Sequence, residues 1–275
     1  MRYQALTTRS RVLAHVITLL SVTCCASLHA TEATVIEAGV GASDLTASEP
    51  DTAPPDAYPN WSSQYLRGWH SPSTSDALVA EVVHATEFND TGTFVGIGDT
   101  HTFNEDWYAS LATGMSDGGV FFPKLRADGF INKKWGPAKN LISVVGLSYY
   151  QAKDEHRDRG YSLGFVYYAE APFTVEGAVR WNTSTPGDVT SRNQFIAVTQ
   201  GRNKQHYITL RVQSGIEAYQ AIGADTALVN FSSHEYSLSW RQWLSEKYGL
   251  TLVGEHYINP SYKRSGASLG VFREF

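Results

Sequence analysis

The stretch FTVEGAVRWN, residues 173–182, carries the clearest strand pattern of this 275-residue chain. Successive side chains of a β-strand point to opposite faces of the sheet. One face of the stretch is apolar and carries Phe173, Val175, Gly177, Val179 and Trp181. The other face is polar or small and carries Thr174, Glu176, Ala178, Arg180 and Asn182. The pattern predicts a strand that separates an apolar environment from a polar one.

The same unit, about ten alternating residues followed by turn residues, recurs along the chain. We expect strands at residues 35–45, 62–70, 77–88, 93–103, 107–116, 124–134, 141–150, 161–168, 173–182, 193–201, 207–214, 236–244, 248–257 and 267–275. The sequence therefore predicts an all-β fold, a transmembrane antiparallel up-and-down β-barrel of about 14 strands. If the first two, weakly patterned strands form a periplasmic tail, the count is about 12, which is also an even number.

The strands of a soluble β-sandwich also alternate between apolar and polar residues. Aromatic residues at the strand ends favour a membrane barrel instead. We expect two aromatic girdles, one at each membrane interface. The girdle near the short turns would contain Trp107, Trp135, Phe173, Trp243, Tyr248 and Phe275. The girdle near the long loops would contain Tyr149, Tyr161, Trp181, Tyr236 and Tyr257.

Connection lengths alternate, as in barrels with short periplasmic turns and long external loops. Short turns are expected at residues 104–106, 170–172, 201–205 and 245–247, and long loops at 46–60, 152–160, 183–192 and 214–235. The connection at Asn89-Asp90 is short where a long loop is expected. The loop 214–235 is long enough to fold inward and plug the lumen.

The last strand ends on an aromatic residue. Leu269, Val271 and Phe275 share one face and resemble the signal that is read by the barrel assembly machinery. Arg273 stands where an apolar residue is usual, and near the interface it would cost about 0–1 kcal/mol.

Residues 1–30 have the basic start, apolar centre and small residues of a cleaved signal peptide, which leaves 31–275 as the barrel. The apolar stretch is too short for a membrane-spanning helix, and no later segment approaches the length that one needs. Both cysteines lie in this leader, which excludes a disulfide-stapled domain. The expected location is the outer membrane, with its lipid as a partner.

The net charge argues against a nucleic-acid partner. Without the three basic residues of the leader, 19 Lys and Arg face 27 Asp and Glu, a balance of −8. Nucleic-acid binding needs a basic surface.

Three further stretches are informative: WSSQYL at 61–66, VVHATEF at 82–88 and the block from His234 onward, which includes RQWLSEKYGL at 241–250 and SGASLG at 265–270. Together, in this order, they resemble the YaiO family. The resemblance implies an outer-membrane β-barrel without an established ligand. It also connects some members with polysaccharide export.

Charged residues on the polar strand faces are candidates for lining the lumen: Glu176, Arg180, Arg211, Arg241 and Glu255. They could pair with one another and fill the interior. Alternatively, they could form a charge-selective constriction. Tyr168 could stack on sugar rings.

Catalytic and metal sites are poorly supported. His70-Ser71 and Ser233-His234-Glu235 are adjacent residues that point to opposite faces, and Asp99 with His101 lacks a second carboxylate. The charged run 154–159 is expected to be a solvated loop. We expect no catalytic residue, cofactor or metal.

We therefore expect a non-enzymatic pore or export-associated barrel for a small polar solute or a polysaccharide. The alternatives are an outer-membrane hydrolase acting on lipid or peptide, and a soluble secreted β-sandwich.

A detergent gel tests the barrel prediction. Membrane-isolated protein should change its mobility on boiling, because a barrel resists detergent until it is heated. Soluble protein without such a shift would favour the sandwich.

Overall fold

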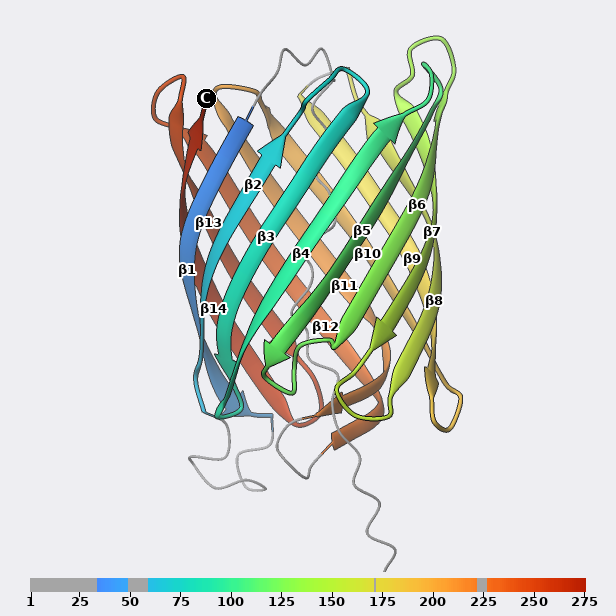
Figure 1. Cartoon of the computed structure of the whole chain (residues 1–275), viewed down its shortest axis with the longest axis vertical. Helices are drawn as coiled ribbons and strands as arrows, with labels where there is room; N and C mark the ends of the chain where they lie inside the picture. Colours follow the sequence, from blue (N-terminus) through green and yellow to red (C-terminus); the bar gives the residue numbers. More distant parts are fainter. Residues whose placement is uncertain (1–33, 49–58, 171, 222–226) are drawn as a thin grey trace, which may run out of the picture.

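Fourteen strands form a closed barrel in the computed structural model, which describes residues 34–48, 59–170, 172–221 and 227–275 (Figure 1). The strands are β1 (Thr34–Ala47), β2 (Trp61–His70), β3 (Asp76–Glu87), β4 (Asp90–Thr102), β5 (Trp107–Gly118), β6 (Leu125–Trp135), β7 (Leu141–Gln151), β8 (Arg157–Tyr168), β9 (Phe173–Thr185), β10 (Val189–Arg202), β11 (His206–Ala221), β12 (Ala227–Trp243), β13 (Tyr248–Ile258) and β14 (Tyr262–Glu274).

Each strand pairs antiparallel with its neighbours in the sequence, and β1 also pairs with β14. The prediction of an all-β up-and-down barrel with 14 strands is confirmed. The 12-strand alternative is wrong, because β1 and β2 belong to the barrel wall. The sandwich alternative is also wrong, since a sandwich keeps free edges and this sheet has none.

Large apolar side chains cover the outside of the wall. Val40, Ile97, Leu111 and Leu147 are between 57% and 68% exposed. Such a surface would promote aggregation in water, but it matches the hydrocarbon of a bilayer. No helix that is long and apolar enough to span a membrane occurs in the described part of the chain.

Most of the expected girdle residues are exposed on this outer surface. At the short-turn end the exposed aromatic residues are Phe103, Trp107, Trp135, Phe173, Tyr248 and Phe275. At the loop end Tyr161 stacks on Trp181 with ring centroids 5.2 Å apart. Trp243 and Tyr257 were wrongly placed in the girdles, because they are 8% and 1% exposed and belong to the interior face.

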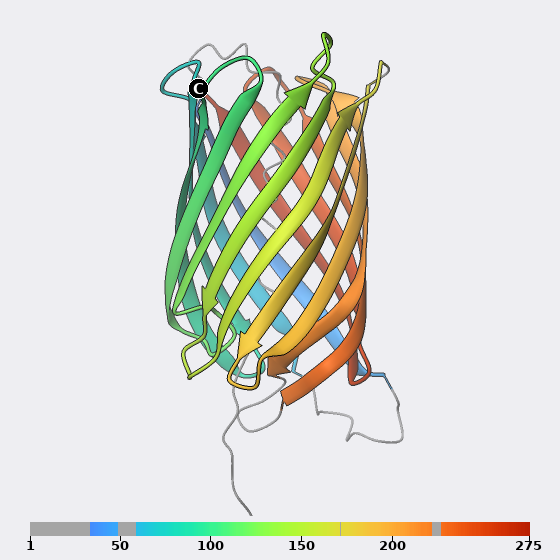
Figure 2. The ribbon, with the colours of Figure 1, turned by 90° about the vertical axis from the view of Figure 1, so that its right-hand side faces the viewer.

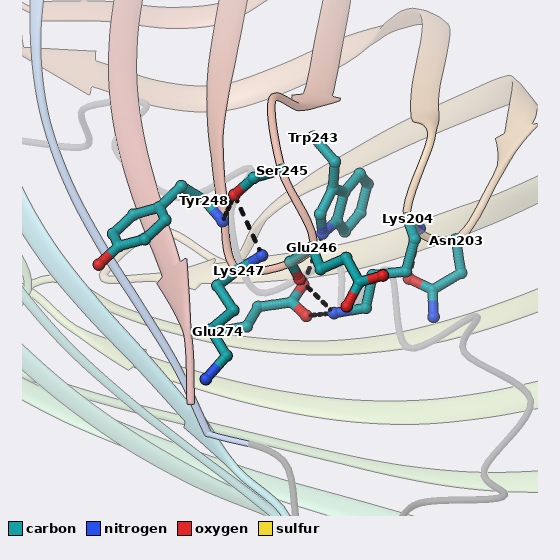
Figure 3. A network of polar contacts seen from close by, with 8 residues as sticks. All are labelled: Asn203, Lys204, Trp243, Ser245, Glu246, Lys247, Tyr248 and Glu274. Atoms are coloured by element: carbon teal, nitrogen blue, oxygen red, sulfur yellow. Dashed lines mark hydrogen bonds and ion pairs between the residues drawn. The ribbon is translucent and has the colours of Figure 1, made fainter.

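The short-turn end is held together by polar contacts around the last strand (Figure 3). Glu274 on β14 accepts a hydrogen bond from Trp243 Nε1 at 2.8 Å and pairs with Lys204 of the β10–β11 turn. Lys204 Nζ also donates to the carbonyl of Glu246 at 2.8 Å. Ser245 Oγ accepts the backbone N–H of Tyr248 at 3.1 Å. Two turns are thereby fixed to β14.

Three of the four expected long loops are shorter in the structure, while the connection 48–60 between β1 and β2 is long as expected. Strands β8 to β12 continue well into the segments 152–160, 183–192 and 214–235. Figure 2 shows the paired ends of β11 and β12 reaching past the other strands. The ladder continues there, for example between Glu217 and Phe231, because strand pairing satisfies the backbone without any need for lipid.

The expectation of a solvated loop at the charged run 154–159 is wrong in part. Glu155 is exposed, but His156 and Asp158 are each 5% exposed. The backbone N–H of His156 donates to Asp154 Oδ1 at 2.9 Å, and Arg157 already belongs to β8. Alternation carries Asp158 to the interior face. Burial lowers the pKa of the neighbouring Lys153 amine.

The connection between β3 and β4 is a two-residue turn. Phe88 and Asn89 have φ values of 50° and 62°. Two consecutive positive φ values are the geometry of a type I′ hairpin turn, whose twist matches that of the strands it joins. No room for a long loop is left at this point of the rim.

Interior aromatic rings lie against glycines of neighbouring strands. A Cβ atom on Gly39 would lie 2.4 Å from Tyr65 Cζ, and one on Gly114 would lie 2.2 Å from Phe94 Cζ. Phe130 covers Gly146 in the same way. The missing side chains let the rings lie along the wall.

Replacement of Gly39 by alanine should destabilise the barrel. The new Cβ would also meet the backbone oxygen of Leu269 at 2.6 Å, and overpacking of this kind costs roughly 1–3 kcal/mol. The guanidinium concentration at the midpoint of unfolding should therefore fall. The gel shift on boiling serves as the readout of folded protein. Gly254→Ala is the matched control, because its Cβ would meet nothing within 4 Å. Equal midpoints for the two variants would contradict this account.

Candidate functional site

The polar strand faces meet in the barrel interior, and the five charged residues singled out from the sequence lie there. Glu176 and Arg211 both pair with Ala197, from opposite sides of β10. Arg211 and Glu255 both pair with Ser237 on β12. These residues therefore share one row of the sheet. Whether they line a passage stays a prediction.

Arg241 is bound by a glutamate that the sequence analysis did not single out. Glu37 Oε2 accepts hydrogen bonds from Arg241 Nη1 at 2.5 Å and from Thr251 Oγ1 at 3.1 Å. Glu37 Oε1 accepts one from Tyr65 Oη at 3.1 Å. Glu37 is 2% exposed. Its partners come from β2, β12 and β13, so this seam cluster spans the junction of β1 with β14.

The Arg241 guanidinium also lies against an aromatic ring. Its Cζ is 3.6 Å from the centroid of Phe272. A cation above a ring face is attracted by the ring quadrupole. The charge is thereby fixed against the wall by a carboxylate and a ring together.

Glu255 belongs to a second cluster nearer the loop end. Arg264 Nη2 lies 3.2 Å from Glu255 Oε1, and the guanidinium is 4.8 Å from the Trp61 ring. Tyr257 Oη donates to Glu217 Oε1 at 3.0 Å. This cluster joins β13 and β14 to the projecting end of β11.

Two further ion pairs were missed in the sequence. Arg67 Nε lies 3.3 Å from Glu81 Oε2, across β2 and β3. Arg126 pairs with Asp128 on β6. Period-two alternation in β2, β3 and β6 is the signal that places these residues on the polar face, but choosing partners needs the register.

Glu176, Arg180 and Arg211 differ from the paired charges. None of the three forms an ion pair with another residue of the described ranges. Arg211 Nη2 donates to Gln213 Oε1 at 3.0 Å. The sequence allowed the five candidate lumen residues to pair with one another. This alternative is wrong, since Arg241 and Glu255 pair with residues outside the five and the other three form no ion pair.

At the loop end, the connection between β5 and β6 packs against the interior face of β3 and β4. Phe121 and Phe122 are 1% and 0% exposed and pack with Val83, Ala85 and Phe94. In the sequence, residues 214–235 are the segment that is long enough to fold inward as a plug. The described part of that segment is mostly strand.

The catalytic candidates do not assemble. His101 Nδ1 lies 2.6 Å from Asp76 Oδ1, so its partner is not Asp99. Asp76 Oδ2 accepts a hydrogen bond from Ser73 Oγ at 2.6 Å, so this serine is bound to the carboxylate.

The other two pairs are similarly dispersed. His70 Nδ1 lies 2.9 Å from Thr34 Oγ1. Ser233 and Glu235 are buried in the interior, while His234 is exposed on the outside. In the described residues no group of three or more His, Cys, Asp or Glu could hold a metal.

Comparison with protein families matches residues 55–220 to the YaiO membrane beta barrel domain. No curated protein matches the sequence.

Solved structures share the fold at low identity. The CymD monoaromatic hydrocarbon channel gives a TM-score of 0.62 at 5% identity, covering 90% of each chain. An outer-membrane channel from Pseudomonas putida F1 gives 0.56 at 8% identity, covering 90% of this chain and 96% of that one. A bacterial polysaccharide outer membrane secretin gives 0.51 at 9% identity, covering 88% and 98%.

Removal of the Glu37 carboxylate should weaken the barrel. Glu37→Ala leaves Arg241 without its ion pair, and breaking a buried pair costs about 3 kcal/mol. The midpoint of denaturant unfolding should fall for Glu37→Ala but not for Glu105→Ala, which removes an exposed turn glutamate.

A double-mutant cycle tests the pairing itself. The double variant Glu37→Ala/Arg241→Ala should lose less stability than the two single variants together, because contacting residues are coupled. Strictly additive losses would show that Glu37 and Arg241 act independently.

Proposed function

This chain belongs to the YaiO family of membrane β-barrels, and we propose that it works in the outer membrane as a non-enzymatic pore or export-associated barrel for a polar solute or polysaccharide. The polar interior is the observation that carries this proposal. An interior built only for stability would be apolar or fully paired, since unpaired charges are costly in a low-dielectric core. Here Glu176, Arg180 and Arg211 lack ion-pair partners in the described residues.

The size of the barrel is consistent with a passage. Barrel diameter grows with strand number, from filled eight-stranded barrels to water-filled porins of about 16 strands. Fourteen strands fall between these cases. Side chains and the β5–β6 connection then decide how much of the lumen remains. Phe121 and Phe122 narrow the loop end.

The similar structures are named for different cargoes. Two of them are named as channels, one of these for monoaromatic hydrocarbons, and a third is named as a polysaccharide secretin. We favour a polar cargo for this chain, because charged residues occupy the interior face.

We further propose export by a signal peptide and insertion by the barrel assembly machinery. The leader, residues 1–30, lies outside the described residues. Leu269, Val271 and Phe275 are 45%, 54% and 58% exposed on the outer surface, where another protein can reach them. The Phe275 N–H donates to the carbonyl of Thr34 at 2.9 Å, so this end is tied to β1.

Planar-bilayer conductance tests the passage. Wild-type protein should form channels, and Arg180→Ala and Glu176→Ala should shift the reversal potential in a salt gradient in opposite directions. The physical reason is that fixed charges in a narrow pore attract counter-ions.

Arg192→Ala is the matched control, because Arg192 pairs with Trp181 and Ile216 on the outer face of β10. Conductance with unchanged selectivity in both interior variants would reject these residues as the selective groups. Folded protein without conductance would argue against an open pore.

A further inference from the structure

Resting on the proposed function, we propose that the solute is anionic and that Arg180 and Arg211 bind it. In the described residues the interior face carries Arg67, Arg126, Arg180, Arg211, Arg241 and Arg264. Four of them have carboxylate partners in Glu81, Asp128, Glu37 and Glu255.

The two remaining arginines lie on either side of one strand. Arg180 on β9 pairs with Asn193 of β10, and Arg211 on β11 pairs with Ala197 of the same strand. Phe195 lies between Asn193 and Ala197 on the interior face. Arg180 and Arg211 thus occupy diagonal positions around this ring, as the two sides of one site.

Arg211 is held in place without a carboxylate. Its Cζ lies 3.7 Å from the centroid of Phe195, and its Nη2 donates to Gln213 at 3.0 Å. Its Nε is buried and has no hydrogen-bond partner in the described residues. A planar guanidinium fixed in this way offers directional donors to a carboxylate or phosphate.

Arg180 is the accessible member of the site. Among the interior charged residues of the described ranges, it alone is exposed, while the others are buried or half-buried. The positive charges of Arg126 and Arg211 both act on it, and Asp128, the opposing charge, already pairs with Arg126. An anion entering here would meet a guanidinium that pairs with no carboxylate of the described residues.

The nearby carboxylates do not reverse this preference. Glu176 and Glu235 act electrostatically on Arg211, but neither forms an ion pair with it. Glu235 is 5% exposed and therefore closed to a solute. Asn193 Oδ1 is buried without a hydrogen-bond partner in the described residues. Its amide adds an uncharged polar group beside the arginines.

Two trisaccharides with the same lactose core test the proposal. Sialyllactose carries a carboxylate and fucosyllactose carries no charge, so their comparison isolates the anion. Binding is measured by calorimetry on the detergent-purified full chain, and block of the bilayer current is recorded separately. Sialyllactose should bind about tenfold more tightly, the equivalent of one charge-assisted contact of about 1.4 kcal/mol.

Matched variants assign the effect to the two arginines. Arg180→Gln and Arg211→Gln should each reduce the preference for sialyllactose, Arg180→Lys should keep much of it, and Arg192→Gln should leave it unchanged. The gel shift on boiling checks that every variant is folded. Competition by inorganic phosphate would assign the site to small anions in general, and its absence would assign the site to acidic saccharides.

The outcomes separate this inference from the proposed pore. Equal binding of the two trisaccharides, or a preference that survives in both Gln variants, overturns the anion site even if the barrel conducts. A preference that depends on Arg180 and Arg211 in a barrel without conductance supports the anion site and contradicts the open pore.

Discussion

Backbone hydrogen bonding limits the forms that a sheet can take in a membrane. Inside a bilayer no water is available for an unpaired N–H or C=O group, so a sheet can span it only as a closed ring. The pairing of β1 with β14 completes that ring, from Val35 with Glu274 to Ala47 with Tyr262. The interior ion pairs either support this seam or occupy the space that it encloses.

The enclosed space determines how the interior is built. Rings such as Tyr65 lie flat where a neighbouring strand has glycine, so aromatic bulk adds to the wall and takes little width from the centre. Charges are placed on the same faces, and most are bound in pairs. Glu176, Arg180 and Arg211, which form no ion pair with other described residues, lie on β9 and β11. The seam cluster of Glu37 draws on β1, β2, β12 and β13.

The strands could be predicted because their signal is local. In FTVEGAVRWN, neighbouring letters already reveal which face is apolar, and the same test found a counterpart for each of the fourteen strands. Loop lengths were less predictable, because β11 and β12 continue their pairing past the apolar belt without a change in composition. A local pattern also cannot tell an interior aromatic residue at a strand end, such as Trp243, from one in a girdle.

The partners in the interior could not be predicted, because they depend on closure. Arg241 and Glu37 are separated by 204 positions in the chain, and only the joined ends of the sheet bring them together. The alternation in β12 indicated that Arg241 faces inward. The sequence around Arg241 and around Glu37 did not indicate which of several opposite charges would be the ion-pair partner of each.

Glu37 and its surroundings also bear on the unfinished barrel. Contacts between distant parts of a chain close the largest loops and tend to form late. Until the two ends join, β1 and β14 are free edges, and a free edge can recruit strands from another molecule. Glu37 on β1 and Arg264 and Glu274 on β14 then stand at those edges as hydrated charges, which natural sheets use to discourage such recruitment. The residues that fasten the seam afterwards would thus first act as gatekeepers against intermolecular aggregation.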